Sequence, residues 1–413
     1  MFLSRLSQNL YTFATMKAMI FTSMPMFVCL FWSITLLLGL LLERFDRSKA
    51  YLLVFMLAAT LLYWGHCVFF NHVTWLMPVA DTIYATCNLA VFPLFYLYIC
   101  RLTLRTSHQR PQWITLLPTM AGGLTIGCFY LLMNDSEQQQ FISIYLYGGS
   151  HNGLVGYAAK QAYVHDVCKA LFALQIVPVF FLGRHHLQEF DTIVRNAYAD
   201  TERKTLAPLH WLLMIFAVCS LFSFIANLIG RQTFSDSYWL LAIPSLLFSS
   251  VLFVLGYLGY RLQFTIADIE HDEQLADMPQ PKQEEVSELR LRIEQIMQSE
   301  KLFLQPNLKI VDLIQRLGSN RNYVYQAINR EMGLSFSEYV NKLRIKYAAE
   351  LLAQRPELKL SEIAEQSGFT SSTSFYRNFK LFCGMGPKEY QNKLKGNAQI
   401  LPYQENSVTL PLL

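Results

Sequence analysis

Glycine and phenylalanine residues near the C-terminus are spaced as in a helix-turn-helix, a motif that presents one helix face to DNA bases. Gly368 lies between two amphipathic segments, and glycine tolerates the positive φ that a sharp turn requires. Thr370 is the predicted N-cap of the following helix. Three apolar residues then recur at steps of four and three: Phe375, Phe379 and Phe382. They share one buried face, which leaves the opposite face for DNA.

A second copy of this pattern lies upstream, between Leu308 and Gly333. Gly318 takes the turn position and Asn320 is the predicted N-cap. The predicted core residues are Leu313, Leu317, Val324 and Ile328. Between the copies, apolar residues at helical spacing predict one long helix: Phe336, Tyr339, Leu343, Tyr347 and Leu351. Such a connector holds two DNA-reading helices at a fixed spacing, and successive major grooves lie about 34 Å apart.

These motifs resemble one known family. From Ser287 to about Lys393, a quarter of the chain, the sequence is similar to the DNA-binding domain of AraC/XylS-type bacterial transcription regulators. The residues that carry the resemblance are Leu313, Gly318, Arg344, Ala348, Leu351, Ile363, Ala364, Gly368, Phe369, Phe375, Phe379, Lys380, Gly384, Pro387 and Tyr390. Two positions depart from it: Ile314 replaces a small alanine, and Gly386 replaces a serine.

The resemblance implies which side chains face the DNA groove. In the first motif they are Arg321, Asn322, Tyr325 and Gln326. In the second motif they are Thr373, Ser374, Tyr376 and Arg377. Gln and Asn bond adenine edges, Arg bonds guanine, and Ser, Thr and Tyr serve bases or phosphates. The plainer interpretation is that each is only a solvated polar residue on an amphipathic helix.

Charge separates this region from the segment before it. Residues 286–396 hold seventeen Lys and Arg against eleven Asp and Glu, a net charge of +6 that favours the DNA backbone. Residues 268–285 hold seven acids and one lysine, a net charge of −6. We therefore predict a DNA-binding domain at 286–396, an acidic linker at 261–285 and a C-terminal tail at 397–413.

Residues 1–260 are predicted to form a domain of seven transmembrane helices. The hydrocarbon core of a bilayer is about 30 Å thick, which about twenty apolar residues cross as a helix. The predicted spans are Met19–Leu42, Tyr51–Phe70, Ile83–Cys100, Trp113–Met133, Tyr163–Leu182, Leu209–Ile229 and Trp239–Tyr260. The expected fold class is all-α: a seven-helix bundle followed by a helical domain with two helix-turn-helix motifs.

Basic residues in the loops predict the orientation. Alternate loops hold ten Lys and Arg, whereas the loops between them hold two. Because cytoplasmic loops are rich in Lys and Arg, the N-terminus is expected outside and the C-terminal domain in the cytoplasm. The expected location is the bacterial inner membrane, with the chain crossing it several times.

Polar residues at membrane depth are the candidates for sensing a signal, because burying them there costs free energy. They are His66, Asn88, Lys169, Gln175 and Asn227. The alternative is that they only reach the interface or bond a neighbouring helix. The eight cysteines show no CxxC pair or metal-ligand spacing, and the chain has no phosphate-binding glycine loop, HExxH or nucleophile elbow. We therefore expect no enzyme, cofactor or metal site.

The sequence predicts a membrane-integrated transcription regulator that senses an unknown external or membrane signal. Its expected partners are double-stranded DNA, the lipid bilayer, a small-molecule signal and a second copy of the chain. The alternative is a seven-span receptor or transporter whose C-terminal module binds a protein. A third interpretation keeps DNA binding and makes the spans a passive anchor.

Overall fold

The computed structural model describes residues 2–42, 46–105, 112–202, 204–229, 238–262, 264–275 and 286–396. The predicted tail at 397–413 and residues 276–285 of the predicted linker lie outside this range. So do Arg44, Arg110, Arg203 and Arg231, which entered the loop charge counts. The described residues are helical, apart from short connections, and contain no strand. The predicted all-α class is confirmed.

The chain divides into two compact units that do not follow its linear order. The first comprises residues 1–188 and 206–263, and the second comprises residues 189–205 and 264–413. Residues 189–205 comprise the end of one long apolar helix and the loop before the next, yet they belong to the second unit.

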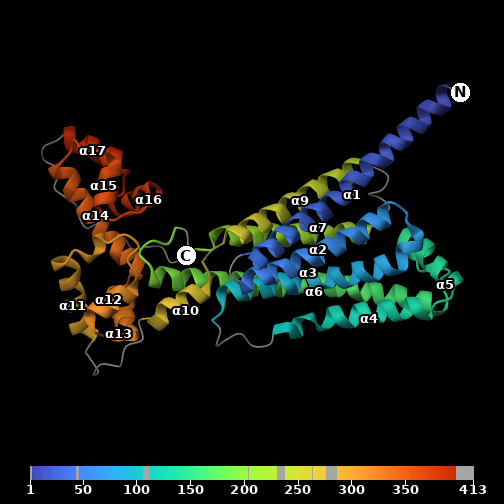
Figure 1. Cartoon of the computed structure of the whole chain (residues 1–413), viewed down its shortest axis with the longest axis horizontal. Coiled ribbons are helices and arrows are strands. Elements are labelled where there is room, and N and C mark those ends of the chain that lie inside the picture. The colour runs from blue at the N-terminus through green and yellow to red at the C-terminus, as the bar shows by residue number, and fades with distance from the viewer. Residues whose placement is uncertain are drawn as a thin grey trace. The chain divides into compact units, whose positions relative to one another are not determined.

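The first unit is a bundle of long apolar helices (Figure 1). Its helices are α1 (Phe2–Leu42), α2 (Arg47–Phe70), α3 (Met77–Thr103), α4 (Leu117–Leu132), α5 (Asp135–Gln140), α6 (Gly156–Ala197), α7 (Ala207–Ile229) and α9 (Tyr238–Arg261). Short turns of 3-10 helix precede α3 and α4, and a π-helical turn, η4 (Phe141–Tyr147), follows α5. In the described part, seven helices are long and apolar enough to cross a membrane, as predicted.

Close packing fixes the centre of this bundle. Helix α2 packs against α1 and α3, α1 packs against α9, and α3 packs against α4. At Gly65 a Cβ atom would lie 2.8 Å from the Cβ of Tyr84, so only glycine lets α2 approach α3 this closely. The outer surfaces instead carry large apolar side chains, such as Leu131, which is 88% exposed.

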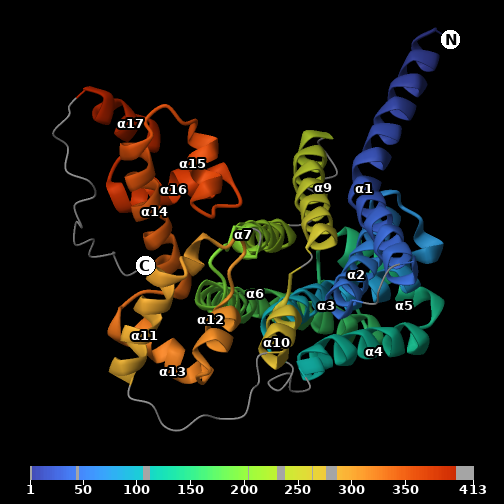
Figure 2. The same cartoon turned by 60° about the vertical axis from the view of Figure 1, so that its left-hand side comes forward.

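The second unit is built from shorter helices (Figure 2). They are α10 (Ile266–Leu275), α11 (Val286–Ser299), α12 (Ile310–Leu317), α13 (Arg321–Gln326), α14 (Phe336–Gln354), α15 (Leu360–Gln366), α16 (Ser372–Cys383) and α17 (Pro387–Gly396). A short 3-10 turn, η5 (Leu302–Leu304), follows α11, and a π-helical turn, η6 (Ala327–Glu331), follows α13. Part of the predicted linker is therefore helical, as α10, and its Ile266 and Ile269 are buried.

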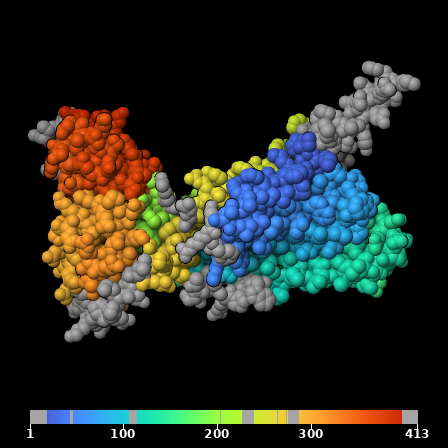
Figure 3. Space-filling model, viewed as in Figure 1, coloured from blue at the N-terminus to red at the C-terminus, as the bar shows by residue number. Residues whose placement is uncertain are grey.

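Two adjoining lobes make up the main part of this unit, coloured orange and red in Figure 3. In the first lobe, α11 packs against α13 and η6, with Leu289, Ile293 and Met297 fully buried. In the second, α14 to α17 enclose Phe375, Phe379 and the aliphatic residues of α14. Helix α14 contacts elements of both lobes and is the connector that the sequence predicted.

Candidate DNA-binding interface

The turn between α15 and α16 depends on Gly368. Its φ is +82°, and its N–H donates to the carbonyl of Glu365 over 2.9 Å. A Cβ at this position would lie 2.6 Å from the carbonyl oxygen of Leu304, well inside van der Waals contact. Both the backbone conformation and the space therefore require glycine, as the sequence predicted. The carbonyl of Ala364 accepts from the N–H of Phe369, which closes the corner.

The N-cap of α16 is Ser371 rather than the predicted Thr370. The Ser371 hydroxyl accepts from the N–H of Ser374 over 3.1 Å, and its backbone is extended, as an N-cap requires. Thr370 uses its hydroxyl differently, as a donor to the carboxylate of Asp200. Either hydroxyl suits a cap, so tertiary contacts decide which residue begins the helix.

Helix α16 buries its phenylalanines and exposes most of its predicted DNA-reading residues. Phe375 and Phe379 are fully buried, whereas Thr373, Tyr376 and Arg377 are exposed. Ser374 lies on the buried side instead, at 6% exposure. The side-chain amide of Asn378 donates to the carbonyl and hydroxyl oxygens of Ser374. Ser374 therefore does not share the outward face of the other three.

The first motif has a shorter recognition helix. As predicted, the Asn320 side chain caps α13 by accepting from the N–H of Asn322, and Gly318 has a φ of +59°. Four predicted core residues are buried: Leu313, Leu317, Val324 and Ile328. The departing residue Ile314 is also buried, so the lobe accommodates it. Among the predicted DNA-reading residues, Asn322 and Tyr325 are exposed, while Arg321 and Gln326 are half-buried.

Arg344 is a structural residue rather than a DNA contact. Its side chain is 1% exposed and donates to the carbonyls of Phe303 and Gln305 over 2.7 and 2.8 Å. Burial lowers the pKa of the guanidinium to about 10, which leaves it charged at neutral pH. Arg344 thus joins the turn after α11 to α14. The charge count of the sequence did not separate it from the basic residues at the surface.

Comparison with known proteins agrees with this geometry. Residues 313–393 match a family model described as a helix-turn-helix domain. The Msm operon regulatory protein of Streptococcus mutans is 30% identical over 91 residues, which cover 22% of this chain and 32% of that protein. The melibiose operon regulatory protein of Escherichia coli (strain K12) is 30% identical over 95 residues, which cover 23% and 31%.

Residues 313–393 form a helix-turn-helix domain of the AraC type. A third relative, the uncharacterized HTH-type transcriptional regulator YtdP of Bacillus subtilis, is 34% identical over 89 residues, which cover 22% of this chain and 11% of that protein. The chain spans about a third or less of the length of these relatives. No solved structure matches the chain significantly. The similarity thus concerns the AraC-type domain.

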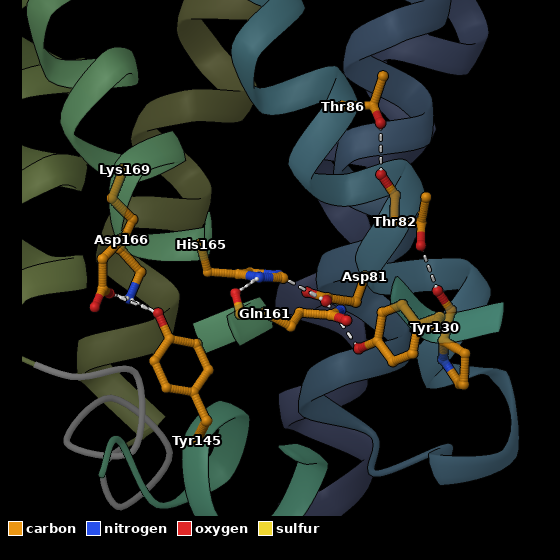
Figure 4. Close-up of polar contacts among 10 residues, drawn as sticks. Asp81, Thr82, Thr86, Tyr130, Tyr145, Gln161, His165, Asp166 and Lys169 are labelled. Atoms are coloured by element: carbon orange, nitrogen blue, oxygen red, sulfur yellow. Dashed lines mark hydrogen bonds and ion pairs between the residues drawn. The ribbon is translucent and has the colours of Figure 1, made fainter. Parts of the chain in front are cut away.

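The first unit, called the seven-helix unit after its seven helices of membrane length, holds a polar cluster that the sequence did not reveal (Figure 4). The buried carboxylate of Asp81 on α3 meets His165 Nε2 on α6 over 2.8 Å and accepts from the Tyr130 hydroxyl over 2.9 Å. Beside them, the Tyr145 hydroxyl donates to Asp166 over 2.6 Å and accepts from Lys169 over 2.9 Å. The cluster includes Lys169 from the predicted set. Asp81 escaped prediction because its partners lie 49 and 84 residues away.

A cavity of about 170 Å³ also lies within this unit. Its walls come from α1, α2, α3, α6, α7 and α9 and are largely aromatic, including Phe55, Phe92 and Phe216. His66 and Asn88, both predicted as sensing candidates, line it together with Ser220. Gln175 is not among the lining residues, and the side chain of Asn227 lies outside the described residues. This arrangement suits an apolar molecule that carries a small polar group.

Proposed function

We propose that this protein is a membrane-integrated, sequence-specific DNA-binding transcription regulator. The observation that carries the proposal is an AraC-type domain, with several predicted base-reading side chains exposed, on the same chain as seven apolar helices of membrane length. The relatives named as operon regulators support the regulatory role of the domain. Arg377 is proposed to bond guanine and Gln326 to bond adenine.

Integration into the bacterial inner membrane is supported by the surface of the seven-helix unit. Leu41, Leu131 and Leu174 are each more than two-thirds exposed. Exposing many such apolar side chains to water would be unfavourable. The loop charges support an N-terminus outside and an AraC-type domain in the cytoplasm, where DNA is. The loop charges are independent of the DNA-binding motifs, and both favour the same orientation.

The seven-helix unit is proposed to sense an external or membrane-borne small molecule. The aromatic cavity supports this role, because a cavity of roughly 150 Å³ is enough to hold one benzene-sized molecule. His66, Asn88 and Ser220 supply the polar groups that would orient such a ligand. We further propose that the regulator acts as a homodimer, since two copies can occupy paired DNA sites.

Crosslinking of the full-length protein to chromosomal DNA in its own cells tests the DNA-binding role. Discrete sites are expected for the native protein, and these sites should disappear in an Arg377→Ala/Gln326→Ala variant. Lys388→Ala, which removes an exposed charge from α17, is the control and should keep them. Sites that persist in the double variant would show that other residues read DNA. Absence of sites in every growth condition would favour the receptor or transporter whose C-terminal module binds a protein.

The same experiment across growth conditions tests the sensing role. Ser220→Phe fills the aromatic cavity and should make occupancy of the DNA sites insensitive to conditions that change it for the native protein. Occupancy that never varies for the native protein would mean that the helices serve only as an anchor.

A further inference from the structure

Helix α6 does not end with its apolar stretch but continues into the AraC-type unit. Its last turns and the loop after it, residues 189–205, belong to the second unit, and we call them the α6–α7 segment. Apolar residues recur here at helical spacing, and Phe190, Val194 and Ala197 are buried. The segment is therefore packed into the second unit, although it continues one membrane-length helix and leads into the next.

The backbone of the segment is held at defined points. The N–H of Ala199 donates to the carbonyl of Leu308 over 3.0 Å, next to an isolated antiparallel bridge between Tyr198 and Lys309. The carbonyl of Ala199 accepts from Ser337 over 3.0 Å and from Asn341 over 3.2 Å, both on α14. These contacts join the segment to α14 and to the residues before α12, and so to both lobes.

The docked segment places polar side chains on the surfaces predicted to read DNA. On α13, the Asn196 amide donates to the hydroxyl of Tyr325 over 3.3 Å. At the start of α16, the hydroxyls of Thr370 and Ser371 donate to the carboxylates of Asp200 and Glu202. One short segment thus contacts both recognition helices or their caps.

Carboxylates at the start of α16 would compete with DNA phosphates for the same hydroxyl groups. Hydroxyls and N–H groups at the start of a recognition helix are donors for phosphate oxygens, and the helix dipole favours an anion there. Asp200 and Glu202 already occupy the hydroxyls of Thr370 and Ser371, and their charges repel a DNA backbone that approaches the same surface. Asn196 likewise occupies a hydroxyl that is predicted to face the groove.

We propose that the α6–α7 segment is an intramolecular inhibitor, so that the docked state excludes DNA and release of the segment permits binding. This inference rests on the proposed DNA-binding function and names the regulation of that site. Helix α6 runs without interruption from Gly156 to Ala197, so it connects the seven-helix unit directly to the segment. It also carries His165, Asp166 and Lys169 of the polar cluster. The apparent DNA affinity then scales with the fraction of molecules whose segment is released.

Binding of full-length protein in lipid nanodiscs to a random-sequence duplex of about 40 base pairs tests this, since backbone contacts are independent of sequence. Asp200→Ala/Glu202→Ala should bind about tenfold more tightly than native protein, the effect that one or two lost hydrogen bonds have on an equilibrium constant. Glu189→Ala removes one negative charge, on an exposed side chain of the same segment, and should change the affinity less than twofold.

A second variant separates docking from charge. Ser337→Ala/Asn341→Ala removes both donors to the Ala199 carbonyl and alters no charge, so it should also tighten binding severalfold. Unchanged or weaker binding by both double variants would overturn the inhibitory role and indicate that the segment supports the fold of the domain. Equal tightening by Glu189→Ala would overturn it too, since general repulsion would then explain the effect.

The inference and the proposed function fail in different ways. Adding Arg377→Ala should weaken DNA binding by the native protein and by each of the two double variants, which we call the released variants. If native protein and released variants bind equally and all respond to Arg377→Ala, only the inhibitory role is wrong. If no variant binds duplex DNA even at low salt, the proposed DNA-binding function itself is wrong, and the inhibitory role falls with it.

Discussion

The side-chain amide of Asn196 donates a hydrogen bond to the hydroxyl of Tyr325 over 3.3 Å. Asn196 lies in the penultimate position of the longest helix that contains an apolar span, and Tyr325 lies on the first recognition helix. The two residues are 129 positions apart in the sequence. Their contact connects the end of α6 directly with a surface that is predicted to read bases.

Gly368→Ala is expected to destabilise the second lobe. The new Cβ would collide with the Leu304 carbonyl, and the positive φ adds strain, together costing about 1–3 kcal/mol. Hydrogen exchange of α15 and α16 in the full-length protein should report the loss as faster exchange. Gly386→Ala is the matched control, because nothing lies within 4 Å of its Cβ position. Equal exchange in the two variants would contradict the proposed role of Gly368.

Arg344→Ala should loosen the junction between η5 and α14. It leaves the buried carbonyl of Phe303 and the carbonyl of Gln305 without this donor, a loss of about 2–4 kcal/mol. Because all six tryptophans precede residue 240, tryptophan fluorescence does not report on this lobe, and hydrogen exchange of residues 302–305 is the suitable measurement. Lys346→Ala on the same helix is exposed and should leave exchange unchanged. With a pKa of about 10, Arg344 stays protonated below about pH 9, so the protection it gives should not vary between pH 6 and pH 8.

The Asp81–His165 pair should behave as a coupled unit in the seven-helix bundle. Removing one partner alone leaves the other buried and incompletely bonded, which costs about 1–3 kcal/mol. Asp81→Asn and His165→Gln should each lower the melting temperature in detergent, followed by tryptophan fluorescence. The double variant should lose less than the two single losses added together. Strictly additive losses would mean that the two side chains do not interact.

The proposed orientation predicts which cysteines a membrane-impermeant maleimide can reach in cells whose outer envelope is permeabilised and whose inner membrane is intact. Asn152→Cys, in the exposed loop before α6, should be labelled without lysis of the inner membrane. Arg355→Cys, at the exposed end of α14, should be labelled only after lysis. Each signal is compared with that of the parent protein, which contains eight native cysteines. The reverse labelling pattern would show that the orientation is the opposite one, with the AraC-type domain outside the cytoplasm and away from DNA.

Features that depend only on short stretches of sequence could be predicted. The seven apolar stretches and the two glycine turns are visible in the sequence because hydropathy and positive φ are properties of short segments. The predicted fifth span ended at Leu182, whereas α6 continues to Ala197. Charged residues hide this extension from hydropathy, although Leu187, Phe190 and Val194 keep a helical spacing and are fully buried. A search for amphipathic periodicity beyond the apolar stretch would have found it.

Contacts between distant parts of the chain could not be predicted. Nothing near Asp81 indicates that His165 and Tyr130 meet it, and the N-cap of α16 shifted from Thr370 to Ser371 where Asp200 engages Thr370. The resemblance to AraC-type regulators implies an outward-facing Ser374, but the geometry of α16 turns this residue toward Asn378.

The membership of residues 189–205 in the second unit limits how this protein can be recombined with others. A chimera joined near residue 264 would separate the AraC-type domain from residues 189–205, which belong to the same compact unit. The Leu308 carbonyl, Ser337 and Asn341 would then lose their partner at Ala199. Exchange of DNA-binding specificity between such proteins, in the laboratory or by gene fusion during evolution, therefore keeps the proposed inhibition only if an interior piece of the chain is carried along with the C-terminal domain.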